Sequence, residues 1–174
     1  LKKQIKKKII NSTGKSENIQ FGKTIDDYAD SYRSDKFTPV DVADNLIKLT
    51  IDAKKGDPLN AVIKLNADDL RRQAKESAER IRHGNPLSLL DGVPIAVKDE
   101  IDAVPYTTSV GTSFLGKDPV VEDAEVVRRL REAGALIFCK TNMHEIGIGV
   151  TGVNTHFSHV KNPYNPACYS GGSS

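Results

Sequence analysis

The chain of 174 residues contains few of the residue types that define several classes of protein. Its only two cysteines, Cys139 and Cys168, lie far apart and lack CxxC spacing, so we expect reduced thiols in an intracellular compartment and no disulfide framework. No apolar run approaches the length that crosses a bilayer, and no apolar segment leads to a small-residue cleavage site. The sequence also lacks the HExxH, P-loop and GxGxxG patterns, so nucleotide binding is unsupported.

Charge of one sign is scarce as well. The formal net charge of +2 is too small to indicate a nucleic-acid partner, and a composition of 38% hydrophobic and 28% charged residues is typical of a soluble globular protein. Much of the basic excess lies within residues 1–23, which we interpret as a flexible basic segment. Leu1, Ile5 and Ile9 follow helical spacing, so peripheral contact with a membrane surface is the alternative.

Three amphipathic helices are expected in residues 24–86, which we interpret as a supporting helical layer. Thr24, Thr38 and Asn66 are the expected N-caps, Pro39 follows Thr38 at the first helical position, and Gly84 ends the third helix. The apolar stripes consist of Ile25, Tyr28, Ala29 and Tyr32, then Val42, Leu46, Leu49 and Ala53, then Leu70, Ala74, Ala78 and Ile81.

Residues 87–174 have a different pattern, typical of an α/β domain. Two short apolar strands, at 93–97 and 135–140, flank a helix that carries acids at its start and ends at Gly134. This order predicts a βαβ unit with parallel strands. The segment 141–149 predicts a further helix capped by Thr141 or Asn142, and the closing segment 151–174 predicts a long loop.

Lys98 is the first candidate for chemistry, because it follows an apolar strand at the sheet edge where ligands bind in open α/β sheets. A lysine whose stem enters a packed sheet loses hydration and can act as a neutral base. The alternatives are a lysine that reaches the surface, or one paired with Asp99, Glu100 or Asp102.

Ser173 is the second candidate. Gly171 and Gly172 allow the tight backbone turn that brings a catalytic hydroxyl close to a partner. A flexible Gly/Ser linker is the alternative, although linkers rarely follow a proline-braced loop such as NPYNPACYS. The four histidines lack metal-ligand spacing, so we expect no metal and no cofactor.

Three motifs together resemble the amidase signature family: LLDGVPIAVKDEID, DAEVVRRLREAGALIFCKTNMHEIGIG and NPYNPACYSGGSS. The helical segments before them are most similar to those of plant-type fatty acid amide hydrolases. The resemblance implies the first part of an α/β/α fold with a mixed sheet. It also implies a Ser–cis-Ser–Lys triad in which Lys98 is the base and Ser173, after a cis peptide bond, is the bridging serine.

By the same resemblance, Ser174 supports the triad, and Met143 and the stretch from Gly147 to Gly149 lie beside the substrate. The attacking serine of the family lies beyond the Gly-Gly-Ser-Ser element, so we expect these 174 residues alone to be inactive. The implied substrate is a small-molecule acyl amide such as an N-acylethanolamine. A homodimer of the parent enzyme and a cytoplasmic or peripheral membrane location are further expectations.

Three alternatives stay open at this point. The chain could belong to a small-amide amidase, or to the component of glutamyl-tRNA amidotransferase that handles glutamine. It could instead be a non-catalytic binding or regulatory fragment, or an incomplete piece with no independent fold.

Overall fold

The computed structural model describes residues 23–53, 55 and 59–173. The expected basic segment at 1–23 lies outside this part of the chain, except for Lys23. Among the described helices, none combines the length and apolar character needed to cross a bilayer.

Side-chain caps fix the starts of the three expected helices. Thr24 and Asp27 form a reciprocal capping box at α2. The Thr38 hydroxyl accepts from the amide of Asp41 at 3.2 Å at the start of α3, and Asn66 accepts from the amide of Asp69 at 3.0 Å at the start of α4. The helices are α2 (Ile25–Arg33), α3 (Pro39–Ala53) and α4 (Ala67–Arg82).

A three-stranded mixed sheet occupies the centre of the described chain, in the order β1-β3-β2. Strand β2 (Pro94–Lys98) runs parallel to β3 (Leu136–Thr141), and α5 (Glu125–Glu132) connects them, so the expected βαβ unit is present. Strand β1 (Val62–Lys64) pairs antiparallel with β3 and was not expected, because three residues show no alternation.

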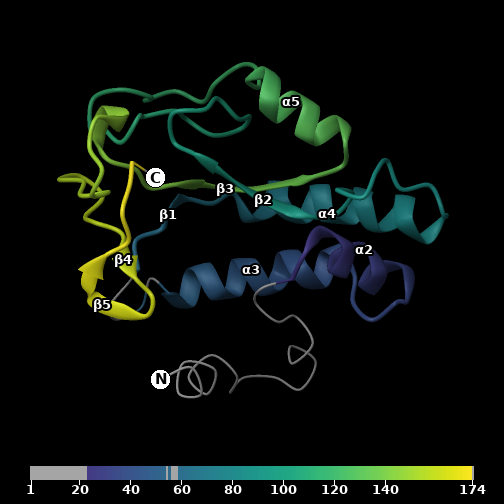
Figure 1. Cartoon of the computed structure of the whole chain (residues 1–174). Helices are drawn as coiled ribbons and strands as arrows, with labels where there is room; N and C mark the ends of the chain where they lie inside the picture. The colour runs from purple at the N-terminus through teal and green to yellow at the C-terminus, as the bar shows by residue number, and fades with distance from the viewer. Residues whose placement is uncertain (1–22, 54, 56–58, 174) are drawn as a thin grey trace.

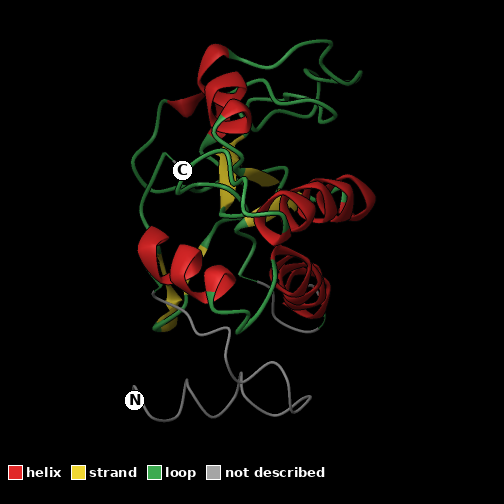
Figure 2. Cartoon of the chain, turned by 90° about the vertical axis from the view of Figure 1, so that its right-hand side faces the viewer, coloured by secondary structure: helices red, strands yellow, loops and turns green. Residues whose placement is uncertain are grey.

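Helices cover both faces of this sheet, as Figures 1 and 2 show. On one face, Leu136 of β3 packs with Ala43 and Ile47 of α3 and with residues of α4. On the other face, the neighbouring Ile137 packs with Val127 of α5. Consecutive strand residues therefore enter opposite cores, which explains why β3 reads as a continuous apolar run rather than an alternating one.

Two apolar stripes differ from the expectation. Ile25 of α2 is 45% exposed, and Ala53 at the end of α3 is exposed. The buried face of α3 instead includes Ala43 and Ile47, because α3 contacts α4 and β3 through these residues.

The expectations for the two C-terminal segments were wrong. In place of a helix at 141–149 there is a single 3-10 turn, η2 (Glu145–Gly147). Ile146 and Gly147 have φ values of 56° and 72°, which an α-helix does not allow. The closing segment is not wholly a loop, because β4 (Lys161–Asn162) and β5 (Asn165–Tyr169) form an antiparallel hairpin.

Candidate active site

The side chain of Lys98 extends from the carboxyl end of β2 and is 18% exposed. Its Nζ donates a hydrogen bond to the Ser173 hydroxyl at 2.5 Å. The same nitrogen lies 3.0 Å from Oε1 of Glu100. Both sequence candidates thus meet at one point, although 75 residues separate them.

Backbone contacts hold Ser173 in place. Its carbonyl accepts from the amide of His144 at 2.7 Å, and the Gly172–Ser173 peptide bond is cis, in agreement with the resemblance. Gly172 lies so close to Gly152 that a Cβ at position 172 would approach the amide nitrogen of Gly152 to 2.5 Å. The glycines therefore allow the close backbone approach that positions the hydroxyl.

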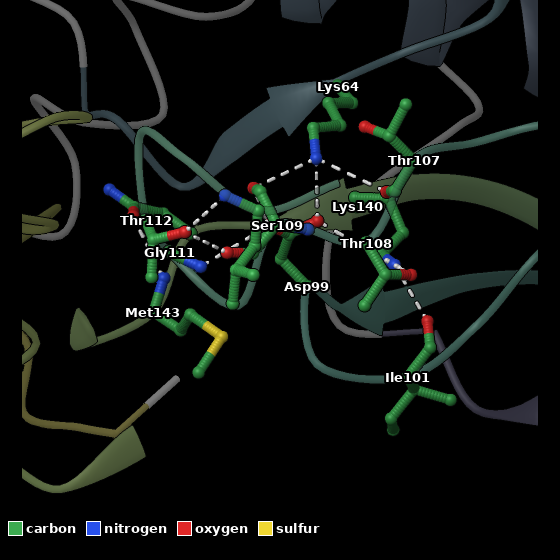
Figure 3. A network of polar contacts seen from close by, with 12 residues as sticks. Lys64, Asp99, Ile101, Thr107, Thr108, Ser109, Gly111, Thr112, Lys140 and Met143 are labelled. Carbon is green, nitrogen blue, oxygen red and sulfur yellow. Dashed lines mark hydrogen bonds and ion pairs between the residues drawn. The ribbon is translucent and has the colours of Figure 1, made fainter. Parts of the chain in front are cut away.

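A buried ionic network surrounds Asp99, the residue that follows β2 (Figure 3). Asp99, fully buried, is 3.0 Å from Nζ of Lys64 and 3.6 Å from Nζ of Lys140. The hydroxyl and amide of Ser109 both donate to Oδ2 of Asp99. Burial lowers the pKa of Lys140, whose Nζ also donates to the carbonyl of Ile101 at 2.6 Å.

This network fixes the loop that supports the site. The amide of Val110 donates to the carbonyl of Asp99 at 3.0 Å, and the amide of Ile146 donates to the carbonyl of Val110 at 2.9 Å. Hydrogen bonds thus connect Asp99, which follows β2, to the loop around Val110 and through it to turn η2. These bonds keep the turn next to the end of the strand that carries Lys98.

Met143 and Gly147, the expected substrate contacts, lie close to each other in this region. Met143 is fully buried, and a Cβ at Gly147 would be 3.8 Å from the methyl carbon of Met143 and 3.2 Å from Oε2 of Glu100. Ser174, the remaining expected contact, lies outside the described residues. The ring of His144 packs directly against Gly149, and its Nδ1 is buried without a hydrogen-bond partner.

No group of histidine, cysteine or acidic side chains in the described residues is arranged to hold a metal ion. His156 pairs with Glu145 at 3.1 Å instead, and both cysteines are free thiols.

Asp91 has no acid–base partner that the sequence indicates. In the structure its carboxylate pairs with Arg80 at 2.7 Å, next to Gly134 in the turn between α5 and β3.

Sequence reasoning missed two polar residues of this region. Glu100 appeared only as one of three acids that could pair with Lys98, because an acidic run does not indicate which side chain turns towards the base. Asn154 is buried and donates to the carbonyls of Gly111 and Met143 at 2.8 and 2.9 Å. A single asparagine in a turn-rich segment gives no pattern from which this role follows.

The Lys98–Ser173 pair can relay a proton, because a neutral amine accepts a proton from a hydroxyl and can return it. Such a relay could activate a second hydroxyl that is hydrogen-bonded to Ser173. The hydroxyl of Ser173 could also attack a carbonyl itself, and only the family resemblance assigns it the bridging role.

The family of the chain follows from comparisons with known proteins. The family model described as Amidase matches residues 50–174. Fatty acid amide hydrolases of rice (indica) and Arabidopsis thaliana are 45% and 41% identical to the chain over 86% of its length, and the chain spans 25% of theirs. The peptide amidase of Stenotrophomonas maltophilia superposes with a TM-score of 0.81 at 29% identity, over 88% of this chain and 32% of that one. The chain therefore belongs to the amidase family.

Proposed function

We propose that this chain forms the proton-relay part of an enzyme that hydrolyses amide bonds, most like the fatty acid amide hydrolases. The contact of 2.5 Å between Lys98 Nζ and Ser173 Oγ supports this proposal more than any other observation. The chain spans about a quarter of the length of the curated relatives it matches, so the proposal concerns the full-length protein, meaning the whole product of the reading frame that contains these residues.

In the proposed mechanism, Lys98 acts in its neutral form as the general base. The Ser173 hydroxyl passes its proton to Nζ and takes one from the attacking serine, which we expect in the part of the enzyme that follows the Gly-Gly-Ser-Ser element. The attacking oxygen then adds to the amide carbonyl, and the same two groups return a proton to the leaving nitrogen, so the amine departs and an acyl ester stays on the attacking serine. Water, whose proton passes to the same relay, then cleaves this ester, which releases the carboxylic acid and restores the serine hydroxyl. Protonating that nitrogen is the demanding step, because an amine anion is a very poor leaving group.

We further propose that Met143, Gly147 and Ser174 lie on the substrate side of this relay. Met143 is buried and its side chain lies next to Gly147, so we propose that it packs behind the turn that carries Gly147. The proposed substrate class is the fatty acid amides, such as N-acylethanolamines, because the relatives at 41–45% identity are named fatty acid amide hydrolases.

A second candidate is transfer of an amide nitrogen from glutamine to charged tRNA. A mitochondrial glutamyl-tRNA(Gln) amidotransferase chain of Ixodes scapularis is 35% identical over 83% of the present chain, which spans 28% of it. This lower identity makes it the weaker proposal.

The test is hydrolysis of N-oleoylethanolamine by the full-length protein and its variants. We expect Lys98→Ala and Ser173→Ala each to lower kcat by about 100-fold or more, which is the usual contribution of a positioned acid–base group. Lys117→Ala and Ser113→Ala change exposed side chains of the same types and serve as controls. Wild-type rates in both site variants would refute the relay, and glutamine hydrolysis without hydrolysis of the lipid amide would favour the second candidate.

A further inference from the structure

We propose that His144 is a positioning residue for Ser173, and that position 149 is a glycine because the imidazole of His144 occupies the space where a side chain would lie. The inference rests on the proposed function, in which Ser173 is the bridging serine of the relay. It assigns a role to two residues that the relay itself does not contain.

One peptide group connects His144 to the serine. The amide of His144 donates to the carbonyl of Ser173 at 2.7 Å. The carbonyl of the same peptide group, which belongs to Met143, accepts from Nδ2 of Asn154 at 2.9 Å. This peptide group is therefore bonded on both sides. A displacement of it would disturb Ser173, whose hydroxyl lies 2.5 Å from Nζ of Lys98.

The chain that follows His144 also contacts the glycine turn before Ser173. A Cβ at Gly152 would lie 2.5 Å from the carbonyl oxygen of Gly171, and one at Gly172 would lie 2.5 Å from the amide nitrogen of Gly152. Residues 144–152 therefore form a loop whose two ends both contact the turn that carries Ser173. The position of the serine hydroxyl thus depends on the shape of this loop.

The imidazole of His144 packs inside this loop. A Cβ at Gly149 would lie 2.1, 2.2 and 2.3 Å from the ring atoms Cε1, Nδ1 and Nε2, far closer than van der Waals contact. Among the described residues, the buried Nδ1 has no hydrogen-bond partner. Packing against Gly149, rather than a hydrogen bond of that nitrogen, therefore keeps the ring in this place.

The backbone at Gly149 does not itself require a glycine. Gly147 and Gly152 have φ values of 72° and 70°, in the left-handed region that favours glycine, whereas Gly149 does not have a positive φ. The three atoms nearest to a Cβ at Gly149 all belong to the ring of His144. Alanine at position 149 therefore conflicts first with the imidazole, and removing the ring relieves this conflict.

The experiment is a double-mutant cycle on kcat for N-oleoylethanolamine hydrolysis by the full-length protein. Competent sites are counted with a fluorophosphonate that reacts with the attacking serine. We expect Gly149→Ala and His144→Ala each to lower kcat per site by about 10-fold, because small displacements of a reacting group are costly. KM is expected to stay near the wild-type value. We expect the double variant to match His144→Ala within about twofold, because no ring is left to displace.

His83→Ala is the matched control, because it removes an exposed imidazole at the end of α4, and we expect wild-type kcat. Independent losses that multiply to about 100-fold in the double variant would refute the coupling. A rise in KM that persists when the ring is removed would show that the alanine meets the substrate instead, which also overturns the proposal. If Gly149→Ala does not fold, the double variant decides. It must fold and have the kcat of His144→Ala, and any other result contradicts the proposal.

Lys98→Ala separates this inference from the proposed function. If Lys98→Ala is inactive while Gly149→Ala and His144→Ala keep the wild-type kcat, the role of His144 is refuted and the relay stands. If Lys98→Ala is active, the proposed function itself is wrong.

Discussion

Adjacent residues at the end of β2 contribute in different ways to the site. Lys98 faces the open side and contacts Ser173, whereas Asp99 enters the buried network and receives two lysines and Ser109. An isolated buried carboxylate would be very unfavourable, but these partners compensate its charge. The buried contacts of Asp99 thus fix the end of the strand, while the neighbouring Lys98 amine contacts the hydroxyl of Ser173.

A second buried carboxylate leads to a prediction about acid stability. Burial alone would raise the pKa of Asp91, but hydrogen bonds from Arg80, the Leu87 amide and Ser77 outweigh it and lower the pKa. The unfolded chain then binds more protons at acidic pH. The stabilisation from Asp91 is therefore complete above its ordinary value of 3.8 and is lost as the pH falls through the lowered value.

We expect Asp91→Asn to reduce the free energy of unfolding of the full-length protein by about 3 kcal/mol near pH 7, because Arg80 loses its buried partner. The difference from wild type is expected to shrink below pH 4. Urea unfolding at several pH values measures this. Asp118→Asn, which changes an exposed aspartate, is the control, and a difference that does not depend on pH would contradict the assignment.

Single site residues could be predicted from the sequence where they belong to a motif of the family. Lys98 and Ser173 could be identified from their places in the family pattern, and the structure brings them together. Glu100 and Asn154 could not, because their contacts depend on the direction of side chains after a strand and within a loop. Such directions follow from tertiary packing rather than from local sequence.

Among the elements, those with side-chain caps and a clear period were predicted well. Helices α2, α3 and α4 begin where Thr24, Thr38 and Asn66 predict. Strand β1 is too short for a period. In the hairpin, β4 has only two residues and β5 is exposed throughout, so neither strand shows an apolar alternation. The helix expected at 141–149 fails because Ile146 and Gly147 are left-handed there, and the contact with Val110 favours a turn.

Two glycines that follow helices allow a matched test at the element scale. Gly84 after α4 and Gly134 after α5 have φ values of 73° and 90°. A Cβ at Gly84 would meet nothing within 4 Å, whereas one at Gly134 would lie 2.8 Å from the Cα of Asp91. The backbone cost is common to both positions, and the steric conflict applies only to Gly134.

We expect Gly84→Ala to lower the free energy of unfolding by about 1 kcal/mol, the cost of a left-handed alanine. Gly134→Ala is expected to lower it by about 3 kcal/mol, because overpacking adds to that cost. Urea unfolding of the full-length variants gives both values. Equal losses would show that the contact with Asp91 is not tight.

At the scale of the whole molecule, the sheet is covered by helices on both faces, and the candidate site lies at the carboxyl ends of its parallel strands (Figure 1). This is the edge at which open α/β sheets bind ligands. The residues that complete the site come from the far end of the chain. The apolar cores thus lie on the two faces of the sheet, whereas the candidate site residues lie at its edge.

The proposed division of the relay predicts the behaviour of these 174 residues in isolation. We expect no turnover of N-oleoylethanolamine by the isolated chain, because the proposed mechanism takes its attacking serine from the region beyond the Gly-Gly-Ser-Ser element. The measurement compares product release by the purified chain with that by the full-length protein at equal concentration. Sustained hydrolysis by the isolated chain that disappears in Lys98→Ala would contradict the missing-nucleophile proposal.

The span of 75 residues between Lys98 and Ser173 also has a consequence for protein synthesis. A ribosome releases β2 and β3 before the segment that carries the serine, and domains tend to fold from the N-terminal side during translation. The contact between the carbonyl of Ser173 and the amide of His144 can therefore form only after β2 and β3 have been synthesised. The proposed contact between Lys98 and Ser173 is therefore absent from any nascent chain that ends before Ser173.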